Sequence, residues 1–334
     1  MFKTLTLRWG LLLFPLFFFF LIFYALRIHF PNEKVPIRFY ANQTRDNLKL
    51  LTAESLRLTK NSIHLASYHL TDEDIINHLN HLAHDKDVTL YLDHTNKRIK
   101  KKLHPNITLH LIKMKGLMHE KICIIDKKYS FLGSANMTRD SLSFHDNIIC
   151  GILSASLAEK LILHLKSLTE NLQTPPLIER INGQKIKILF SPLSGEEAAN
   201  LIKKGIQKAE QEIFISMFTF THRPIIHLLL EERKKGKNVD VYLDQTTSRG
   251  SSKWAKEHLN PSLNRSSSLF HHKWVLLDQK KIIFGSANWT QGAFKRNADY
   301  VCQISPLTPK QKKFFKKISK KIKQETHIPN KNKT

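Results

Sequence analysis

Cysteine is scarce in this sequence. The three cysteines, Cys123, Cys150 and Cys302, are too few for a disulfide framework, and their spacing matches no zinc site. Each lies in an apolar run typical of a β-strand, so we expect all three to be small buried side chains. Neither disulfides nor a structural zinc ion is therefore expected to hold the fold together.

Acidic residues are also few, because 28 Asp and Glu stand against 53 Lys and Arg and give a formal net charge of +25. Such a surplus attracts polyanions, namely nucleic acid or anionic lipid headgroups, and says nothing about the fold. A hydrophobic fraction of 41%, with 20 Phe and 4 Trp, excludes an intrinsically disordered chain. The composition therefore predicts a folded protein with a basic surface.

One long apolar run lies near the N-terminus, from Leu11 to Leu26, with basic residues on both sides. As a helix it would span about 24 Å, slightly less than the hydrocarbon layer of a bilayer. No small-x-small cleavage site follows it, so we interpret residues 1–30 as an uncleaved membrane anchor rather than a signal peptide. Similar flanking charges leave the orientation open. We expect the rest of the chain to be exported, or secreted if the segment is cleaved.

The remaining chain contains an internal duplication with an offset of about 150 residues. In each copy a strand-like segment, a helical pattern, a second strand, a second helical pattern and a short buried strand follow one another, an order typical of parallel α/β folds. The short strands read VTLYLD and VDVYLD and end at Asp93 and Asp244. The predicted segments are a first repeat at 35–173, a proline-containing linker at 174–185, a second repeat at 186–325 and a basic tail at 326–334.

Each copy ends in a helical pattern. In the second copy Phe314 and Ile318 lie on one side and lysines lie elsewhere, so this helix could rest on a membrane surface. An equivalent pattern closes the first copy, which favours packing of Phe314 and Ile318 on the core.

The same motif occurs once in each copy: HEKICIID and HHKWVLLD are each followed by GSAN at equal distance. Its residues are His119, Lys121, Asp126, Gly133, Ser134 and Asn136 in the first copy, and His271, Lys273, Asp278, Gly285, Ser286 and Asn288 in the second. One HxKxxxxD pattern would be weak, but two with identical spacing are not a chance match.

Residues two apart on a strand point to one face, so each copy presents an imidazole beside an ammonium group. Asp126 and Asp278 have the opposite parity near the strand's end, which favours a turn or scaffold role over a reacting one. Gly133 and Gly285 permit a tight turn that brings the asparagine amides of the motif near the site. Two imidazoles, two ammonium groups and two amides that converge would suit a phosphodiester.

A metal site is the rival interpretation of these histidines. Histidine beside lysine is a poor ligand set, and neither an HExxH nor a CxxC pattern accompanies it. We therefore expect chemistry that needs neither a metal nor another cofactor.

With these motifs, and with the segments MFTFTHRPIIHLL and GSANWT, the chain from Val35 to Lys323 resembles the phospholipase D superfamily. That superfamily includes phospholipases D, cardiolipin synthases and hydrolases, phosphatidylserine synthases and several nucleases. The resemblance implies an α/β fold of two tandem units, each a mixed β-sheet flanked by helices, related by pseudo-twofold symmetry. It also implies one active site at their interface, within a monomer.

The resemblance further implies a phospholipase D-like phosphodiesterase or phosphatidyltransferase that works through a phosphohistidine. By this carry-over His119 is the nucleophile and His271 the general acid. Lys121, Lys273, Asn136 and Asn288 would bind the phosphate, while Asp126 and Asp278 would support the site.

One position departs from the family pattern, which places an acidic residue 28 positions after each histidine to hold its second ring nitrogen. Asp299 fits the pattern in the second copy. The first copy has Asn147 there, with Asp146 beside it on the other strand parity. An amide oxygen accepts the same hydrogen bond without bringing charge, so we expect His119 to be less basic than His271.

Two substrate classes stay open. Hydrolysis or exchange of phospholipid headgroups is favoured by the predicted anchor and by the basic chain, which suits a membrane with an anionic surface. A nuclease is the alternative, since a chain of charge +25 binds nucleic acid through phosphate contacts alone. A binding module without activity fits poorly, because both copies keep the whole motif. The segments 95–118 and 246–270, before each HxK, are expected to be loops that shape substrate access.

Overall fold

The computed structural model describes residues 28–44, 46–170, 172, 174–264 and 268–327. The chain divides into two compact units, Met1–Phe30 and Pro31–Thr334, and every described helix and strand belongs to the second. The apolar run Leu11–Leu26, predicted to be an anchor, lies outside the described residues. Among the residues that are described, no helix is both long and apolar enough to cross a membrane.

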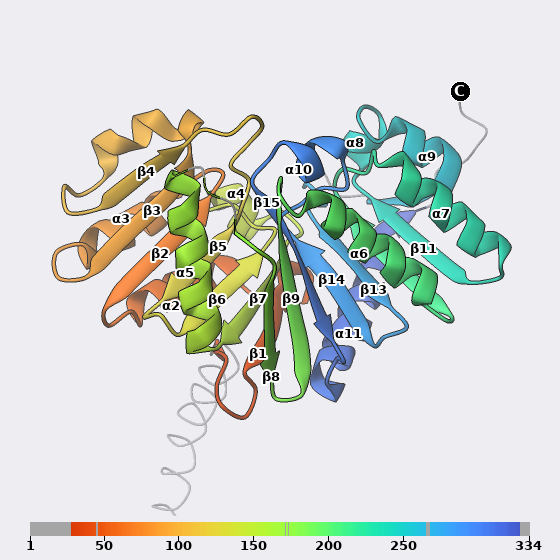
Figure 1. Cartoon of the computed structure of the whole chain (residues 1–334), viewed down its shortest axis with the longest axis horizontal. Helices are drawn as coiled ribbons and strands as arrows, with labels where there is room; N and C mark the ends of the chain where they lie inside the picture. Colours follow the sequence, from red (N-terminus) through yellow and green to blue (C-terminus); the bar gives the residue numbers. More distant parts are fainter. Residues whose placement is uncertain (1–27, 45, 171, 173, 265–267, 328–334) are drawn as a thin grey trace, which may run out of the picture. The chain divides into compact units, whose positions relative to one another are not determined.

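The second unit contains two β-sheets, one for each predicted repeat (Figure 1). The first has seven strands in the order β1-β7-β6-β5-β2-β3-β4 and the second has nine in the order β16-β12-β11-β10-β13-β14-β15-β9-β8. The strands of the first sheet are β1 (Ile37–Ala41), β2 (Ser62–Ser67), β3 (Asp87–Asp93), β4 (Thr108–Ile112), β5 (Ile122–Ile125), β6 (Tyr129–Gly133) and β7 (Ile148–Leu153). The strands of the second are β8 (Leu177–Ile181), β9 (Gln184–Ser191), β10 (Glu212–Met217), β11 (Asn238–Leu243), β12 (Ser262–Asn264), β13 (Lys273–Leu277), β14 (Lys281–Gly285), β15 (Asp299–Ser305) and β16 (Thr326–His327).

Helices cover both faces of each sheet. In Figure 1, α5 lies in front of the first sheet with α2 and α3 behind it, whereas α6 and α7 lie in front of the second sheet with α11 behind it. The helices of the first repeat are η1 (Asn42–Thr44), α2 (Leu48–Arg57), α3 (Glu73–Leu82), η2 (His94–Lys102), α4 (Arg139–Ser143) and α5 (Ala155–Thr169). Those of the second are α6 (Gly195–Lys208), α7 (Arg223–Lys234), α8 (Gln245–Ser248), α9 (Lys253–Leu259), α10 (Gln291–Lys295) and α11 (Pro309–Glu325). The last helix of the first repeat thus lies on the same side as the first two helices of the second repeat, as a pseudo-twofold relation requires. The expected fold of two mixed sheets flanked by helices is confirmed.

The direction of the strands decides which residues meet at one edge. β2, β3 and β4 are parallel, and β5 runs antiparallel to β2, so β5 begins at the edge where the parallel strands end. The second sheet repeats this arrangement with β10, β11, β12 and β13. The predicted strand and helix order is therefore right, but the first strand of each copy pairs antiparallel with the last, β1 with β7 and β9 with β15. The carboxyl ends of parallel strands are where α/β folds place their ligands.

The segment predicted to be a linker, residues 174–185, is partly a strand. β8 pairs antiparallel with β9 and extends the second sheet, and burial alternates along it: Leu177, Glu179 and Ile181 are less exposed than Ile178 and Arg180. Lys160 of α5 forms an ion pair with Glu179 of β8 at 2.8 Å, which ties the last helix of the first repeat to the second sheet. The predicted basic tail begins with β16, which pairs with β12, and its residues 328–334 lie outside the described residues.

One hydrophobic core joins the two repeats. It contains residues of β1, α5 and β7 together with residues of β9, β14 and α11, so the halves are packed as one body. Phe315 and Ile318 of α11 are fully buried in it and Phe314 packs against it, which confirms that this helix rests on the core rather than on a membrane. The three cysteines are buried thiols, as expected.

Candidate active site

The two HxK motifs lie at the edges where the parallel strands end. His119 lies near the end of the connection from β4 to β5, and His271 near the end of the connection from β12 to β13. The two edges face each other, because the backbone N–H of His119 donates to the carbonyl of Ala298 at 2.8 Å and that of Asp146 donates to the carbonyl of Leu269 at 2.9 Å. The first histidine therefore sits against the second repeat, and the second sits against the first.

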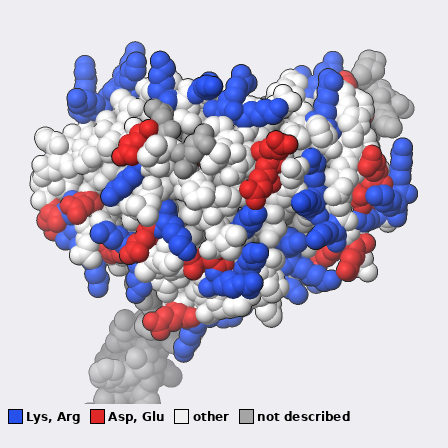
Figure 2. Space-filling model, viewed as in Figure 1, with Lys and Arg blue, Asp and Glu red and all other residues white. Residues whose placement is uncertain are grey.

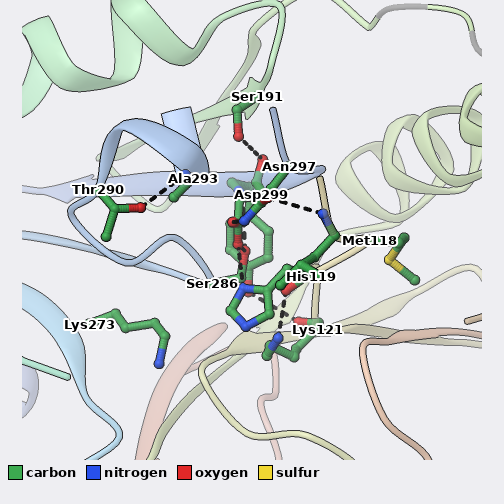
Figure 3. Close-up of polar contacts among 12 residues, drawn as sticks. Met118, His119, Lys121, Ser191, Lys273, Ser286, Thr290, Ala293, Asn297 and Asp299 are labelled. Carbon is green, nitrogen blue, oxygen red and sulfur yellow. Dashed lines mark hydrogen bonds and ion pairs between the residues drawn. The ribbon is translucent and has the colours of Figure 1, made fainter. Parts of the chain in front are cut away.

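The acceptor for His119 comes from the other repeat. Its Nδ1 lies 2.8 Å from Oδ1 of Asp299 at the start of β15 (Figure 3). A carboxylate only accepts hydrogen bonds, so Nδ1 carries the proton and Nε2 keeps its lone pair. Ser286 donates to the same carboxylate oxygen at 2.7 Å, and Asn297 donates to the other oxygen at 3.1 Å. These bonds fix both the tautomer and the orientation of the His119 ring.

The acceptor for His271 also comes from the other repeat, but it is an amide. Nδ1 of His271 lies 2.9 Å from Oδ1 of Asn147. The amide nitrogen of Asn147 donates to the carbonyl of Ser141 at 2.8 Å, and Ser134 donates to its oxygen at 2.7 Å. The amide oxygen is thus turned to His271, which again leaves Nε2 of the ring with its lone pair.

The expected order of basicity is therefore wrong. The sequence places Asp299 and Asn147 at equal spacing from the histidines of their own repeats, yet each holds the histidine of the other repeat. A carboxylate stabilises an imidazolium and an amide does not, so His119 is the more basic ring and His271 the less basic one.

Burial dominates the titration of both rings. Burial, and then the charge of Lys121, lowers the pKa of His119 to about 4, against the opposing effect of Asp299. Burial together with the charges of Lys273 and Lys121 lowers the pKa of His271 well below its usual 6.5. Burial alone would raise the pKa of Asp299, but His119, Lys121 and Ser286 hold it below its usual value. In the free protein both rings are therefore neutral at pH 7 and Asp299 is ionised.

The two lysines of the motifs are buried and close enough to influence each other. Nζ of Lys121 donates to the carbonyl of His119 at 2.6 Å, and Nζ of Lys273 donates to that of His271 at 3.0 Å. Figure 3 shows both ammonium groups on the side of the His119 ring that is turned away from Asp299. Burial lowers the pKa of Lys121 to about 7, and burial plus the charge of Lys121 lowers that of Lys273 well below 10.5. A bound anion would favour the charged form of both groups.

An aromatic side chain packs against each half-site. Tyr68 follows β2, and its ring lies edge-on to His119 at 5.4 Å and 5.6 Å from Nζ of Lys121. Phe218 follows β10 in the same way, 4.9 Å from the His271 ring and 5.1 Å from Nζ of Lys273. Both rings therefore shield a histidine and a lysine of the site from water. Sequence reasoning did not single them out.

A second pair of residues that sequence reasoning missed is Asp93 and Asp244. Each is fully buried at the end of a parallel strand, and each accepts from the backbone N–H of the residue before the histidine, Met118 at 2.9 Å and Phe270 at 2.9 Å. They fix the backbone from which the imidazoles project. The identical YLD at the end of VTLYLD and VDVYLD was the available signal.

The glycine and serine of GSAN act through close approach rather than through a special turn. A Cβ on Gly133 would lie 2.1 Å from the carbonyl oxygen of Ile148, and one on Gly285 would lie 2.2 Å from that of Tyr300. These glycines are therefore needed for the contact with the neighbouring strand, and neither has a positive φ. We expected these glycines to permit a tight turn. Instead, glycine is required because a side chain at either position would collide with the neighbouring strand.

The asparagines of GSAN follow β6 and β14 at the same edge. Met137, next to Asn136, accepts from Thr71 and donates to His69, so this segment lies beside Tyr68. Trp289, next to Asn288, likewise accepts from the backbone N–H of Thr221 and donates to the carbonyl of Thr219. Oδ1 of each asparagine is buried and has no partner among the described residues.

Asp126 and Asp278 lie at the opposite edge of their sheets, in the turns that follow β5 and β13. The carboxylate of Asp126 accepts from the backbone N–H groups of Lys60, Asn61 and Ser62, which lead into β2. Asp278 accepts from the corresponding residues 210, 211 and 212 before β10. These hydrogen bonds agree with the turn or scaffold role expected from strand parity, and neither carboxylate lies at the edge that holds the histidines.

The segments before each HxK, expected to be loops, contain helices and strands in their described residues. Residues 95–118 contain most of η2 and all of β4, and residues 246–270 contain α9, β12 and most of α8. The described residues contain no cluster of three or more His, Cys, Asp or Glu side chains that could hold a metal ion.

Comparisons with known proteins agree with this geometry. A family model described as "Cardiolipin synthase, PLD-like domain" matches residues 53–169 and 202–325, one match within each predicted repeat. Phospholipase D of Rickettsia conorii is 28% identical over 133 residues, which cover 38% of this chain and 64% of that protein. Mitochondrial cardiolipin hydrolase of Chlamydomonas reinhardtii is 29% identical over 101 residues, which cover 29% of this chain and 45% of that protein. This chain thus spans less than two thirds of the curated relatives that it matches.

Among solved structures, phosphatidylserine synthase of Haemophilus influenzae superposes with a TM-score of 0.70 at 14% identity, over 88% of this chain and 87% of that one. Polyphosphate kinase of Porphyromonas gingivalis superposes with a TM-score of 0.62 at 13% identity, over 90% of this chain and 53% of that one. At such identities the likeness shows the fold alone.

Fold and site together define a duplicated α/β protein whose two copies share one histidine and lysine centre. The chain belongs to the phospholipase D superfamily, in the PLD-like domain family described as cardiolipin synthase.

Proposed function

We propose that this protein hydrolyses or exchanges the headgroup of phospholipids through a phosphohistidine intermediate. The observation that carries the proposal is the pair of imidazoles, each oriented at Nδ1 by the opposite repeat and each with a lone pair at Nε2. Two such rings beside two ammonium groups suit an in-line displacement at phosphorus.

In the first step, Nε2 of His119 attacks phosphorus and the bond between phosphorus and the leaving oxygen breaks. Imidazolium His271 gives its Nε2 proton to that oxygen, so one covalent bond forms and one breaks without free alkoxide. In the second step, His271 takes a proton from water or an alcohol, whose oxygen displaces His119 from phosphorus. Lys121 and Lys273 stabilise the charge on the nonbridging oxygens throughout.

The difference between Asp299 and Asn147 supports this division of roles. A phosphorylated imidazole that still carries a proton on Nδ1 is cationic, and the carboxylate of Asp299 stabilises that charge on His119. Asn147 brings no charge to His271, so the imidazolium of His271 is a stronger acid and gives up its proton more readily. This argument favours His119 as nucleophile and His271 as general acid.

The bound substrate supplies the protonation that the general acid needs. In the free protein burial, and after it the charges of Lys273 and Lys121, lowers the pKa of His271. A phosphodiester anion between these groups offsets their charge, so the pKa of His271 rises when the substrate binds. His271 thus gains its proton more readily in the complex than in the empty site.

A phospholipid is the substrate favoured by the sequence and by the relatives. The apolar run Leu11–Leu26 is predicted to anchor the chain in a membrane, and matched relatives carry the names phospholipase D and cardiolipin hydrolase. A nuclease of the same superfamily is the alternative, favoured by the net charge of +25. Anchoring would confine the site to the bilayer that contains the substrate.

The test is an incubation of the full chain in detergent with headgroup-labelled phospholipids and with labelled single-stranded DNA, each in the presence of a chelator. The proposal expects headgroup release, loss of release in His119→Ala, and unchanged release in the control His78→Ala, a histidine of α3 away from the site. Added glycerol distinguishes exchange from hydrolysis through the formation of phosphatidylglycerol. Cleavage of DNA without release of headgroup would overturn the proposal in favour of the nuclease.

A further inference from the structure

Six cations form an exposed surface beside the site, here named the basic rim: Lys97, Arg98, Lys100, Lys101, Lys113 and Lys115. The first four belong to η2, directly after β3, and the last two follow β4. None of the six forms an ion pair with a carboxylate in the described ranges of the chain. Figure 2 shows Lys and Arg side chains gathered along the upper edge of the view, including its left part, where β4 lies in Figure 1. The charge of the rim is therefore available to a partner.

The rim is connected directly to the site. One oxygen of Asp93 accepts from the backbone N–H of Thr95 at 3.0 Å at the start of η2, and the other accepts from that of Met118 at 2.9 Å beside His119. Asn96 of η2 donates to the carbonyl of Tyr68 at 2.7 Å, and the Tyr68 ring lies against His119. The rim and the first half-site thus share one rigid support.

Apolar side chains are exposed near both histidines of the site. Leu117, two residues before His119, is 37% exposed, and Phe144 is 58% exposed. Phe144 precedes His145, whose ring lies 6.3 Å from the ring of His271. Exposed apolar side chains beside cations match the surface of an anionic bilayer, where phosphates lie directly above the acyl layer.

We propose that the basic rim docks this protein on an anionic bilayer, with Phe144 and Leu117 entering the headgroup layer beside the site. This inference rests on the proposed function, because it gives the lipid substrate a route from the bilayer to the histidines. Each cation near such a surface contributes about fivefold to partitioning, so three of them contribute about 100-fold.

A fluorescent probe at position 144 tests the contact without relying on activity. All three native cysteines are buried, so Phe144→Cys in the His119→Ala background of the full chain carries one reactive thiol for an environment-sensitive dye. Leu58→Cys is the matched control, because Leu58 is 52% exposed and lies just before β2, at the opposite edge of the sheet. Vesicles of phosphatidylcholine, with and without one third phosphatidylglycerol, are then titrated into each labelled protein.

The charge of the rim is tested in the same assay with Lys97→Gln, Lys100→Gln and Lys101→Gln combined. Its control removes equal charge from exposed lysines of α11, through Lys312→Gln, Lys313→Gln and Lys316→Gln. Any contribution of residues 1–27 to vesicle binding is common to both variants.

The proposal expects a blue shift of the probe at 144 with phosphatidylglycerol vesicles and none at 58. The vesicle concentration at half-shift should rise by about 100-fold in the rim variant and by less than threefold in the α11 variant. An equal effect of both variants, the absence of any shift at 144, or a stronger response to single-stranded DNA than to vesicles would overturn it. The separate assay of headgroup release tests the chemistry. A probe shift without headgroup release would contradict the proposed function alone, and headgroup release without a probe shift would contradict docking through the rim alone.

Discussion

Nδ1 of His119 lies 2.8 Å from Oδ1 of Asp299, a residue 180 positions further along the chain. The matching contact of the other half joins Nδ1 of His271 to Oδ1 of Asn147 at 2.9 Å. Each repeat therefore orients the imidazole of the other, so neither repeat holds a complete site. Because one acceptor is a carboxylate and the other an amide, the two histidines are chemically different.

Exchange of the two acceptors should change activity in different ways. We expect Asp299→Asn to lower kcat/KM for phospholipid by about 10- to 100-fold, since His119 loses its charged partner. Asn147→Asp should raise the pKa of His271, because a carboxylate favours the imidazolium, and should move the fall in kcat at alkaline pH to higher pH. The pH profiles of kcat and kcat/KM of the two variants and of the unaltered protein check this. Equal effects of the two substitutions would contradict the asymmetry of the site.

Binding of anions should depend on pH through Lys121, whose pKa is lowered to about 7 by burial. Below pH 7 the ammonium is charged and attracts an anion, and above it the amine becomes neutral. The dissociation constant of sulfate, whose charge is constant in this range, should therefore rise by up to about tenfold per pH unit above pH 7 when binding is measured by calorimetry. In Lys121→Arg this pH dependence should be markedly weaker, because guanidinium stays charged. A flat profile in the unaltered protein would show that Lys121 keeps an ordinary pKa.

The same buried cation should cost stability. The folded-state pKa of Lys121 is about 7 and its usual value is 10.5, so the unfolded chain binds more protons between these values and stability rises with pH there. We expect Lys121→Met to abolish turnover and yet raise the free energy of unfolding by about 1–4 kcal/mol at pH 7. The gain should shrink toward pH 10. Denaturant unfolding at the two pH values measures it, and a destabilised variant at pH 7 would count against the burial of a charged amine.

Asp126 and Asp278 should affect folding rather than chemistry. Asp126→Ala removes the acceptor of the N–H groups of residues 60–62 and should lower the free energy of unfolding by about 2 kcal/mol. Since the turn lies at the far edge of the sheet, kcat of the folded variant should stay within about threefold of the parent. The single variant Asp278→Ala should show the same loss of stability and the same retained kcat as Asp126→Ala. A large fall in kcat at unchanged stability would show instead that these residues take part in the chemistry.

Much of the fold could be predicted from the sequence because the chain contains an internal duplication. The duplicated order of strands and helices and the equal spacing of the HxK and GSAN motifs indicated two α/β units with a common site. Strand parity placed Asp126 and Asp278 in turns, since alternation of side chains is a local property of a strand. The packing of Phe314 and Ile318 of α11 on the core followed in the same way from helical periodicity, although Phe314 is only partly buried and the unpredicted Phe315 is buried fully.

Contacts between the repeats could not be predicted in this way. Asp299 and Asn147 have the same spacing from their own histidines, and spacing does not say which ring each acceptor faces. The answer comes from the packing of the two sheets, which brings β15 to His119 and residue 147, just before β7, to His271. β8 was hidden by the adjacent prolines before it, because pairing with β9 depends on a partner strand and not on local propensity.

The most direct test of the shared site is mass spectrometry of the full chain, quenched with acid-free denaturant during turnover of a phospholipid. Two imidazoles acting on one phosphorus predict a single phosphatidyl adduct per chain, located on His119 and absent from His119→Ala. Adducts on both histidines of one chain, or an adduct on His271 in the unaltered protein, would contradict the account.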